Sequence, residues 1–164
     1  MNVKPRVYLE TTIPSSLSAW PSRDLVMAAN QEVTREWWAN RRVAFELFVS
    51  QAVIKESSAG DQDAATRRSE LLRTCPRLDI SDDVERLAAK LIKDVPLPLK
   101  AQVDALHIAV AAVDRMDYWL TWNCTHIANA ALRTRIEAVC RSAGYEPPVV
   151  CTPQEMLELG DLDA

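Results

Sequence analysis

Several side chains with oxygen atoms stand at the ends of apolar segments that are far apart in this sequence. Glu10 and Glu56 each come just after a short apolar run. Asn123 follows a third run, and Asp104 begins a further apolar segment. In an open α/β sheet the carboxyl ends of parallel strands meet along one edge, where ligands bind. We therefore expect these side chains to converge in the folded protein.

A cluster of this kind has the chemistry of a divalent-cation site. Carboxylates are hard anionic ligands that suit Mg²⁺ or Mn²⁺ better than soft metals. Two carboxylates about 4 Å apart repel by roughly 4 kcal/mol at an effective dielectric near 20, so they favour a bound cation or protons. Water held by Mg²⁺ can attack phosphorus in line. The set predicts metal-assisted phosphodiester hydrolysis, with Glu10, Asp104 and Glu56 as metal ligands and Asn123 as an auxiliary oxygen.

Each of these residues also has a purely structural explanation. Asp104 stands in the first turn of an expected helix, where the helix dipole favours a negative side chain. Glu56 could pair with a neighbouring lysine, and Asn123 could form a turn. Glu10 is harder to explain in this way, because a carboxylate after a buried strand needs water, a donor or a metal. His107 lies in a packed helical segment and is interpreted as a hydrogen-bonded core histidine without a catalytic role.

The length and composition indicate one globular domain. The chain has 164 residues, of which 48% are hydrophobic and 26% charged, as in ordinary globular proteins. We expect a single domain over residues 1–164 with a core from about 6 to 159. A net charge of −4 argues against a general nucleic-acid coating protein. The sequence has no apolar run of about 18 residues and no signal-peptide core, which predicts a cytoplasmic protein without a membrane partner.

The cysteines argue against a zinc site. There are 4 of them, without any Cys-x-x-Cys spacing, in a chain that shows no export signal. This usage is typical of reduced thiols.

The apolar periodicity predicts strands that alternate with helices. Strands are expected at residues 6–10, 43–50, 77–80, 118–121 and 149–151. Helices are expected after Ser22 to about Asn40, around Glu56, after Asp61, after Ser81, and at 101–115, 126–143 and beyond Thr152. This alternation favours an α/β fold, in which helices cover both faces of a largely parallel sheet.

Two of the expected helices have clear local signals. In the first long helix, Leu25, Ala29, Val33 and Trp37 recur every four residues and define the expected inner face. The last helix is expected to begin with a capping box, Thr152-Pro153-Gln154-Glu155.

With these segments in view, the chain resembles the PIN-domain nucleases, in particular the VapC-like toxins of type II toxin-antitoxin systems. The matching segments occur in the family's order through almost the whole chain, at residues 7–12, 53–56, 104–109, 120–123 and 126–129. The resemblance implies a three-layer α/β/α fold with a mostly parallel five-stranded sheet. It also implies an endoribonuclease that hydrolyses RNA phosphodiester bonds with Mg²⁺ or Mn²⁺, forms a homodimer and is inhibited by a cognate antitoxin protein.

The resemblance assigns roles to four positions. Glu10 stands where the family has its first aspartate, and Glu56 stands at its glutamate. Asp104 stands at its helix aspartate, and Asn123 stands at its last acidic position. Glutamate at position 10 is one methylene longer than aspartate, which moves the carboxylate out by about 1.5 Å. The alternative is therefore a catalytically weakened PIN scaffold that acts as a protein- or RNA-binding module.

Overall fold

A five-stranded parallel sheet forms the centre of the molecule, which is described here from a computed structural model for residues 3–123 and 130–159. The strand order is β3-β2-β1-β4-β5, and every neighbouring pair is parallel. The strands are β1 (Arg6–Leu9), β2 (Glu46–Ser50), β3 (Arg77–Leu78), β4 (Tyr118–Leu120) and β5 (Val149–Cys151). The predicted α/β class with a five-stranded, largely parallel sheet is confirmed.

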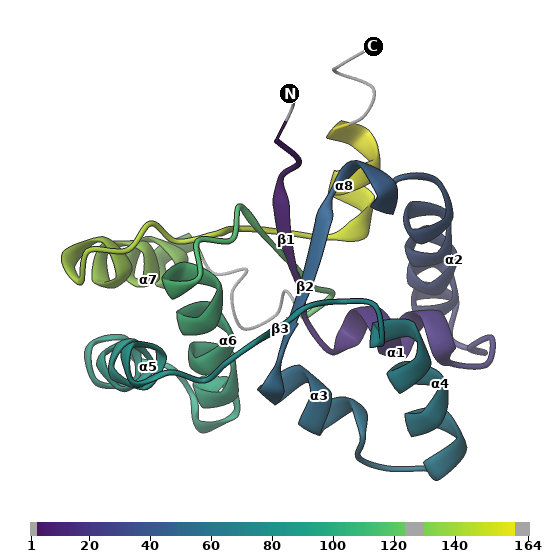
Figure 1. The fold of residues 1–164 in the computed structure, drawn as a ribbon, viewed down its shortest axis with the longest axis horizontal. Coiled ribbons are helices and arrows are strands. Elements are labelled where there is room, and N and C mark those ends of the chain that lie inside the picture. Colours follow the sequence, from purple (N-terminus) through teal and green to yellow (C-terminus); the bar gives the residue numbers. More distant parts are fainter. Residues whose placement is uncertain (1–2, 124–129, 160–164) are drawn as a thin grey trace.

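Helices lie on both sides of the sheet, as the alternation of elements predicts (Figure 1). One side carries α5 (Asp82–Asp94), α6 (Gln102–Val113) and α7 (Ala130–Ser142). The other side carries α1 (Thr12–Ser18), α2 (Leu25–Asn40), α4 (Gln62–Leu72) and α8 (Pro153–Glu158). The short helix α3 (Gln51–Ser57) follows β2 directly. Two 3₁₀ turns, Arg42–Ala44 and Leu99–Ala101, complete the elements of the described residues.

The central strand β1 is buried on both faces. Val7, Tyr8 and Leu9 have no exposed surface, as expected for the middle strand of a parallel sheet covered by helices. Tyr8 pairs with Phe48 of β2 on one side and with Trp119 of β4 on the other. This register brings the carboxyl ends of β1, β2 and β4 together at one edge of the sheet.

The first long helix begins later than the sequence predicted. α2 begins at Leu25, and its N-cap is Asp24, whose side chain accepts a hydrogen bond from the backbone amide of Met27. The predicted cap, Ser22, instead accepts a hydrogen bond from the backbone amide of Asp24. Serine and aspartate are both good cap formers, so the sequence alone does not decide between Ser22 and Asp24.

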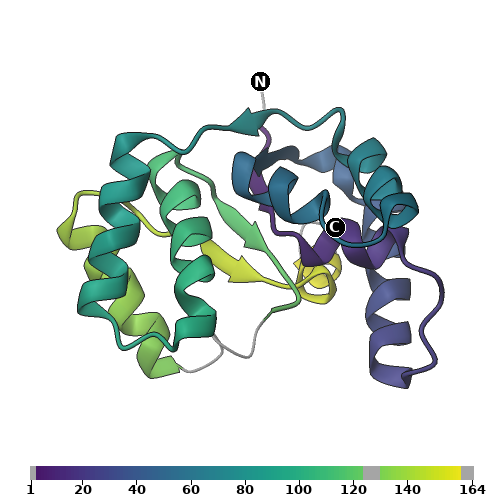
Figure 2. The same ribbon diagram turned by 90° about the horizontal axis from the view of Figure 1, so that it is seen from below.

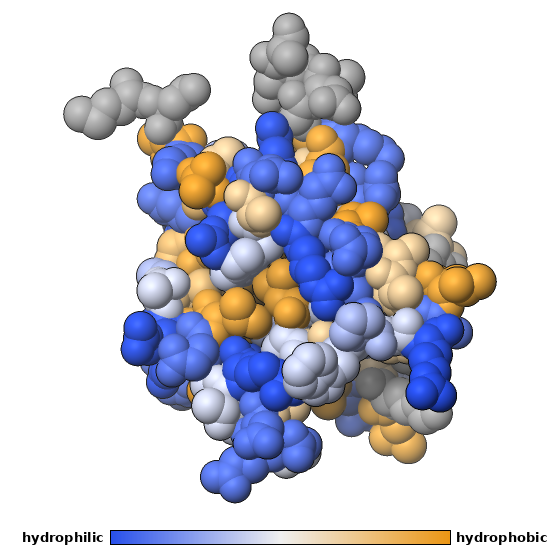
Figure 3. Space-filling view, turned by 90° about the vertical axis from the view of Figure 1, so that its right-hand side faces the viewer, coloured by the Kyte–Doolittle hydropathy of each residue, from blue (hydrophilic) through white to orange (hydrophobic). Residues whose placement is uncertain are grey.

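The predicted inner face of α2 is also wrong in its first half. Leu25 is 87% exposed, whereas the buried residues are Gln31, Thr34 and Trp37. The cause is visible in Figure 2, where the first turns of this helix extend away from the rest of the molecule and have no layer to pack against. The exposed apolar side chains there are Leu25, Val26 and Met27. Figure 3 shows this side of the molecule, where hydrophobic residues interrupt the hydrophilic surface in several places.

Most other expected boundaries agree with the structure. β2 begins at Glu46 and not at residue 43, because residues 42–44 form a 3₁₀ turn. The predicted helix at 126–143 is seen from Ala130, and its first residues lie outside the described part of the chain. Signals that the structure confirms are the caps Asp61 and Ser81, Gly144 with φ 91° after α7, and the capping box of Thr152 and Glu155.

Two further expectations concern the whole chain. Among the described residues, Cys75 and Cys140 are free and buried, in agreement with reduced thiols. In the part of the chain that the structure describes, no helix has both the length and the apolar character needed to cross a bilayer.

Candidate metal centre

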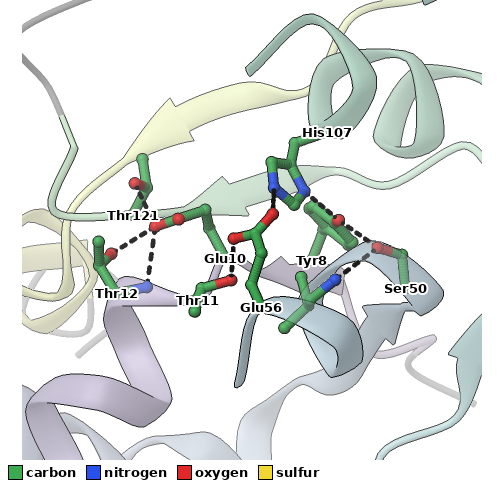
Figure 4. A network of polar contacts seen from close by, with 9 residues as sticks. Tyr8, Glu10, Thr11, Thr12, Ser50, Glu56, His107 and Thr121 are labelled. Carbon is green, nitrogen blue, oxygen red and sulfur yellow. Dashed lines mark hydrogen bonds and ion pairs between the residues drawn. The ribbon is translucent and has the colours of Figure 1, made fainter. Parts of the chain in front are cut away.

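Glu10 is fixed at the carboxyl end of β1 by hydroxyl and amide donors (Figure 4). Its Oε2 accepts hydrogen bonds from the backbone amide of Thr12 at 3.0 Å, from the Thr12 hydroxyl, and from the Thr121 hydroxyl at 2.9 Å. The residue is only 6% exposed, and a buried carboxylate is costly without such donors. The hydrogen bonds that the described residues donate to this carboxylate all go to Oε2.

Glu56 lies beside Glu10, in the last turn of α3. Its Oε2 accepts a hydrogen bond from the Thr11 hydroxyl at 2.6 Å, and its Oε1 lies 2.8 Å from Nε2 of His107. Burial raises the pKa of Glu56, but the hydrogen bonds from His107 and Thr11 outweigh burial and leave that pKa below its ordinary value. Glu56 is therefore a carboxylate at neutral pH.

His107 reaches the same place from α6. It is 1% exposed, and its Nδ1 lies 2.6 Å from the Tyr8 hydroxyl, which in turn lies 2.7 Å from the Ser50 hydroxyl. Burial, followed by the nearby charge of Glu56, raises the pKa of Tyr8, so its phenol stays neutral. The histidine is hydrogen-bonded and buried, as the sequence predicted. Sequence reasoning missed its contact with Glu56, although a signal existed in its position three residues after Asp104.

Together these side chains form a compact group of possible metal ligands. One ligand atom from each of Glu10, Glu56 and His107 lies within 4.8 Å of the other two. Among the described residues, these three form the cluster of acidic and histidine side chains that could hold a metal ion. Two carboxylates supply the charge and the hard oxygens that Mg²⁺ or Mn²⁺ prefers. The donor set therefore fits a hard divalent cation, with the histidine either as a third ligand or as a partner of Glu56.

The other two predicted residues lie outside that group. Asp104 lies in the first turn of α6 and is 5% exposed. It precedes His107 by three residues, so both side chains are on the same face of the helix. Asn123 follows the end of β4 and is partly buried, and its backbone amide donates to the Thr121 hydroxyl at 2.9 Å. Other residues of the same two segments contact the carboxylates, since His107 of α6 lies against Glu56 and Thr121 donates to Glu10.

A cavity of about 510 Å³ lies against the two carboxylates. Glu10 and Glu56 line it together with Trp122 and residues of α1 and α2. Its volume is in the range of small-molecule and cofactor sites. A larger cavity of about 710 Å³ lies between α2, β2 and α4, but none of the predicted site residues lines it. The smaller cavity is the one that the chemistry favours.

The protein is thus an α/β/α domain with carboxylates at the carboxyl edge of its sheet. No protein-family model matches the sequence, and no curated protein matches it significantly. The structure is similar to VapC20 of Mycobacterium tuberculosis, a sarcin-ricin loop cleaving toxin, with 15% identity over 76% of this chain and 95% of that one, and a TM-score of 0.59. It is also similar to VapBC2 of Rickettsia felis bound to a promoter DNA fragment. That match has 13% identity over 90% of this chain and 98% of that one, with a TM-score of 0.52.

These two similarities define the fold as that of VapC-like PIN domains. At such low identities they establish the fold alone. The site residues of this chain have to be argued from their own geometry.

Proposed function

We propose that this protein is a Mg²⁺- or Mn²⁺-dependent endoribonuclease of the VapC type, which hydrolyses RNA phosphodiester bonds. The observation that carries the proposal is the compact group of Glu10, Glu56 and His107 beside an open cavity. The fold supports it, because VapC20, a sarcin-ricin loop cleaving toxin, has a similar structure. The single PIN-like domain over residues 1–164 is part of the same proposal.

The proposed ligands are the carboxylates of Glu10, Glu56 and Asp104, bound directly or through water, with Asn123 as an auxiliary oxygen. When bound, the cation supplies an activated water and neutralises charge that develops on the phosphate. The protein's own part is to keep the carboxylates in place. Donors from the ends of β1 and β4 hold Glu10, and Thr11 and His107 orient Glu56.

The proposal includes partners and location. The substrate is RNA, and the active form is a homodimer in the cytoplasm. A cognate antitoxin protein is the proposed inhibitor, by analogy with VapBC2, whose structure this chain resembles.

Cleavage assays with matched carboxylate variants test the proposal. Structured and single-stranded RNAs are incubated with the protein and Mg²⁺ or Mn²⁺, or with EDTA. We expect metal-dependent cleavage that falls by about 100-fold or more in Glu56→Gln and in Asp104→Asn, because each change removes a charged ligand. Glu46→Gln is the matched control, since Glu46 is an exposed residue at the opposite end of β2 from α3. Cleavage that persists unchanged in Glu56→Gln and Asp104→Asn contradicts the proposed site.

The alternative function, a weakened PIN scaffold that binds protein or RNA without cleaving it, rests on Glu10 in the place of an aspartate. The structure gives the longer side chain a defined position, since a backbone amide and two threonine hydroxyls bind one of its oxygens. That support favours a working site over the alternative.

A further inference from the structure

We propose that the cavity beside the two carboxylates binds one unpaired RNA base, which stacks on the indole of Trp122 and is hydrogen-bonded to Asn30. The inference rests on the proposed function and deepens it, because it names the residues with which the same site recognises its substrate. Trp122, Asn30 and Arg67 carry it, and none of them is a proposed metal ligand.

Trp122 lies at the carboxyl edge of the sheet, two residues after β4. It is partly exposed and lines the cavity of about 510 Å³ together with Glu10 and Glu56. Its indole Nε1 donates to the Thr34 hydroxyl at 2.7 Å, and its backbone amide donates to the Thr12 hydroxyl at 2.9 Å. Because the one polar atom of the ring is bonded to the buried Thr34, the indole presents mainly carbon to the cavity. A fixed aromatic surface of this kind is one on which a nucleobase stacks.

Polar side chains of α1 and α2 also line the cavity. They are Ser15, Ser16, Asn30 and Gln31. Gln31 is engaged within the protein, because its side-chain amide binds the Trp20 carbonyl oxygen and the Ser22 backbone amide. Asn30 is partly buried, and no described residue forms a hydrogen bond with its side-chain amide. It therefore offers a donor and an acceptor to the edge of a base, which presents both kinds of group.

The size of the cavity fits a single nucleotide and not a base pair within a helix. A volume of about 510 Å³ is in the range of sites for drug-sized ligands. A base in a duplex would have to leave its stack to enter, which costs a few kcal/mol. A base in a single-stranded segment is already free to do so. The cavity therefore favours an unpaired base.

A positive charge is available for the RNA backbone at the other end of α1. Nε of Arg67, on α4, donates to the Ser18 carbonyl oxygen at 3.0 Å, and its guanidinium lies 5.5 Å from the ring centre of Trp20. No acidic side chain of the described residues forms an ion pair with Arg67. Ser18 and Thr12 are the ends of α1, about 9 Å apart along the helix axis. One end of α1 thus adjoins the carboxylates, and the other end has a cation that attracts a phosphate of the same strand.

Binding of short RNAs tests the inference. A labelled single strand and a duplex of the same sequence are titrated with the protein in Ca²⁺, and a gel checks that the RNA stays intact. We expect Trp122→Leu to bind the single strand about 10-fold or more weakly, because one stacked base typically contributes that much to affinity. Binding of the duplex should not change. Equal single-strand affinities in the parent and Trp122→Leu overturn the inference.

Further variants separate stacking from a structural role of the ring. Trp122→Phe keeps an aromatic face, and Thr34→Val keeps the indole without its hydrogen-bond partner, so we expect both to bind the single strand within about 3-fold of the parent. Trp38→Leu is the matched control, because Trp38 is a partly buried tryptophan that lines the larger cavity. Losses in Trp122→Phe and Thr34→Val as large as in Trp122→Leu, or an equal loss in Trp38→Leu, contradict a stacking site.

A fluorescent base tests stacking in the parent protein itself. 2-Aminopurine is placed at successive positions of a strand of uridines, and its fluorescence is recorded as the protein is added. Stacking on an indole quenches this fluorophore, so we expect quenching at one position that disappears in Trp122→Leu. An absence of quenching at every position of the bound strand overturns the inference without any variant.

The role of Asn30 is tested by base preference. Asn30→Ala should change the ratio of the affinities for strands of uridine and of adenosine by about 5-fold or more, because hydrogen bonds to a base edge discriminate to this extent. Asn40→Ala is the matched control, since Asn40 is exposed at the far end of α2, about 15 Å from Asn30 along the helix. A ratio that is the same in the parent and Asn30→Ala contradicts the assignment of Asn30.

Cleavage assays with Mg²⁺ distinguish this inference from the proposed function. If the parent cleaves RNA but Trp122→Leu keeps the single-strand affinity, the base site fails and the nuclease stands. If binding of the single strand depends on Trp122 but no RNA is cleaved, the proposed nuclease function fails and the base site stands.

Discussion

At the scale of single residues, the position of Glu10 depends on Thr12. The Thr12 hydroxyl donates to Oε2 of Glu10 and accepts from the backbone amide of Trp122 at 2.9 Å. The indole of Trp122 in turn donates to the hydroxyl of Thr34 at 2.7 Å. A carboxylate on β1 is thereby connected to the end of β4 and to α2. The longer side chain of glutamate is part of this arrangement.

Glu10→Asp measures how far the site depends on that length. Aspartate is shorter by about 1.5 Å and cannot keep the same contacts with Thr12 and Thr121 without moving the backbone. We expect RNA cleavage by Glu10→Asp to fall by about 100-fold, since misplacement on this scale can cost that much. The measurement is kcat/KM beside the parent, with circular dichroism to show that the variant is folded. A gain of activity in Glu10→Asp supports the weakened scaffold instead.

The sequence predicted some of these residues and not others, for a physical reason. Glu10 and Glu56 stand directly after strand-forming segments, and parallel strands end at one edge, so their convergence could be expected. The role of His107 could not, because it depends on Tyr8 and Ser50 of two other strands, which read as ordinary buried positions in the sequence. Hydrogen bonds between distant buried residues leave no local pattern.

At the scale of elements, the short helix α3 connects Ser50, whose hydroxyl contacts Tyr8, to the Glu56 carboxylate. Ser50 is the last residue of β2 and the N-cap of α3, where its hydroxyl accepts from the backbone amide of Val53. Glu56 lies near the other end of the same helix. The helix therefore sets the separation between Ser50 and Glu56, and His107 spans that separation from α6. The sequence near Glu56 was enough to predict α3. It was not enough to predict the buried face of α2, because that face depends on which other elements cover the helix.

The burial of Cys140 in α7 predicts a pH-dependent stability. Cys140 on α7 has no exposed surface, and burial raises the pKa of its thiol from 9.0 to about 11. Because the folded pKa is the higher one, this thiol's contribution to the free energy of unfolding is complete below pH 9 and is lost between pH 9 and about pH 11. The loss is roughly 2 kcal/mol by pH 11.

Chemical unfolding of the parent and of Cys140→Ala under reducing conditions checks this prediction. Other groups titrate in both proteins, so the quantity of interest is the difference between their free energies of unfolding. We expect the advantage of the parent to shrink as the pH rises from 8 to 11. A difference that stays constant over this range contradicts the assignment to Cys140.

At the scale of the whole molecule, folding concentrates negative charge at one edge of the sheet. Glu10 and Glu56 have ligand atoms within 4.8 Å of each other, and they repel more strongly when folded than when the chain is unfolded. A cation that binds only the folded state adds stability by mass action, about 2.7 kcal/mol at a concentration of 100 Kd. The proposed site therefore predicts a metal-dependent thermal stability.

Thermal unfolding with and without Mg²⁺ tests that expectation. For a domain of this size, Tm should rise by roughly 5–10 °C at saturating Mg²⁺. Glu10→Gln and Glu56→Gln should lose most of this rise, and the exposed control Glu46→Gln should keep it. An equal rise in all of these variants would place the bound Mg²⁺ elsewhere on the protein.

The hydrogen bond between Glu10 and Thr121 joins residues 111 positions apart. During synthesis the amino-terminal part of a chain leaves the ribosome first, at about 5–20 residues per second. A nascent chain thus carries Glu10 and Glu56 for several seconds before β4 emerges to pair with β1. If the protein cuts RNA, the ribosome that makes it holds an inactive polypeptide until the last third of translation.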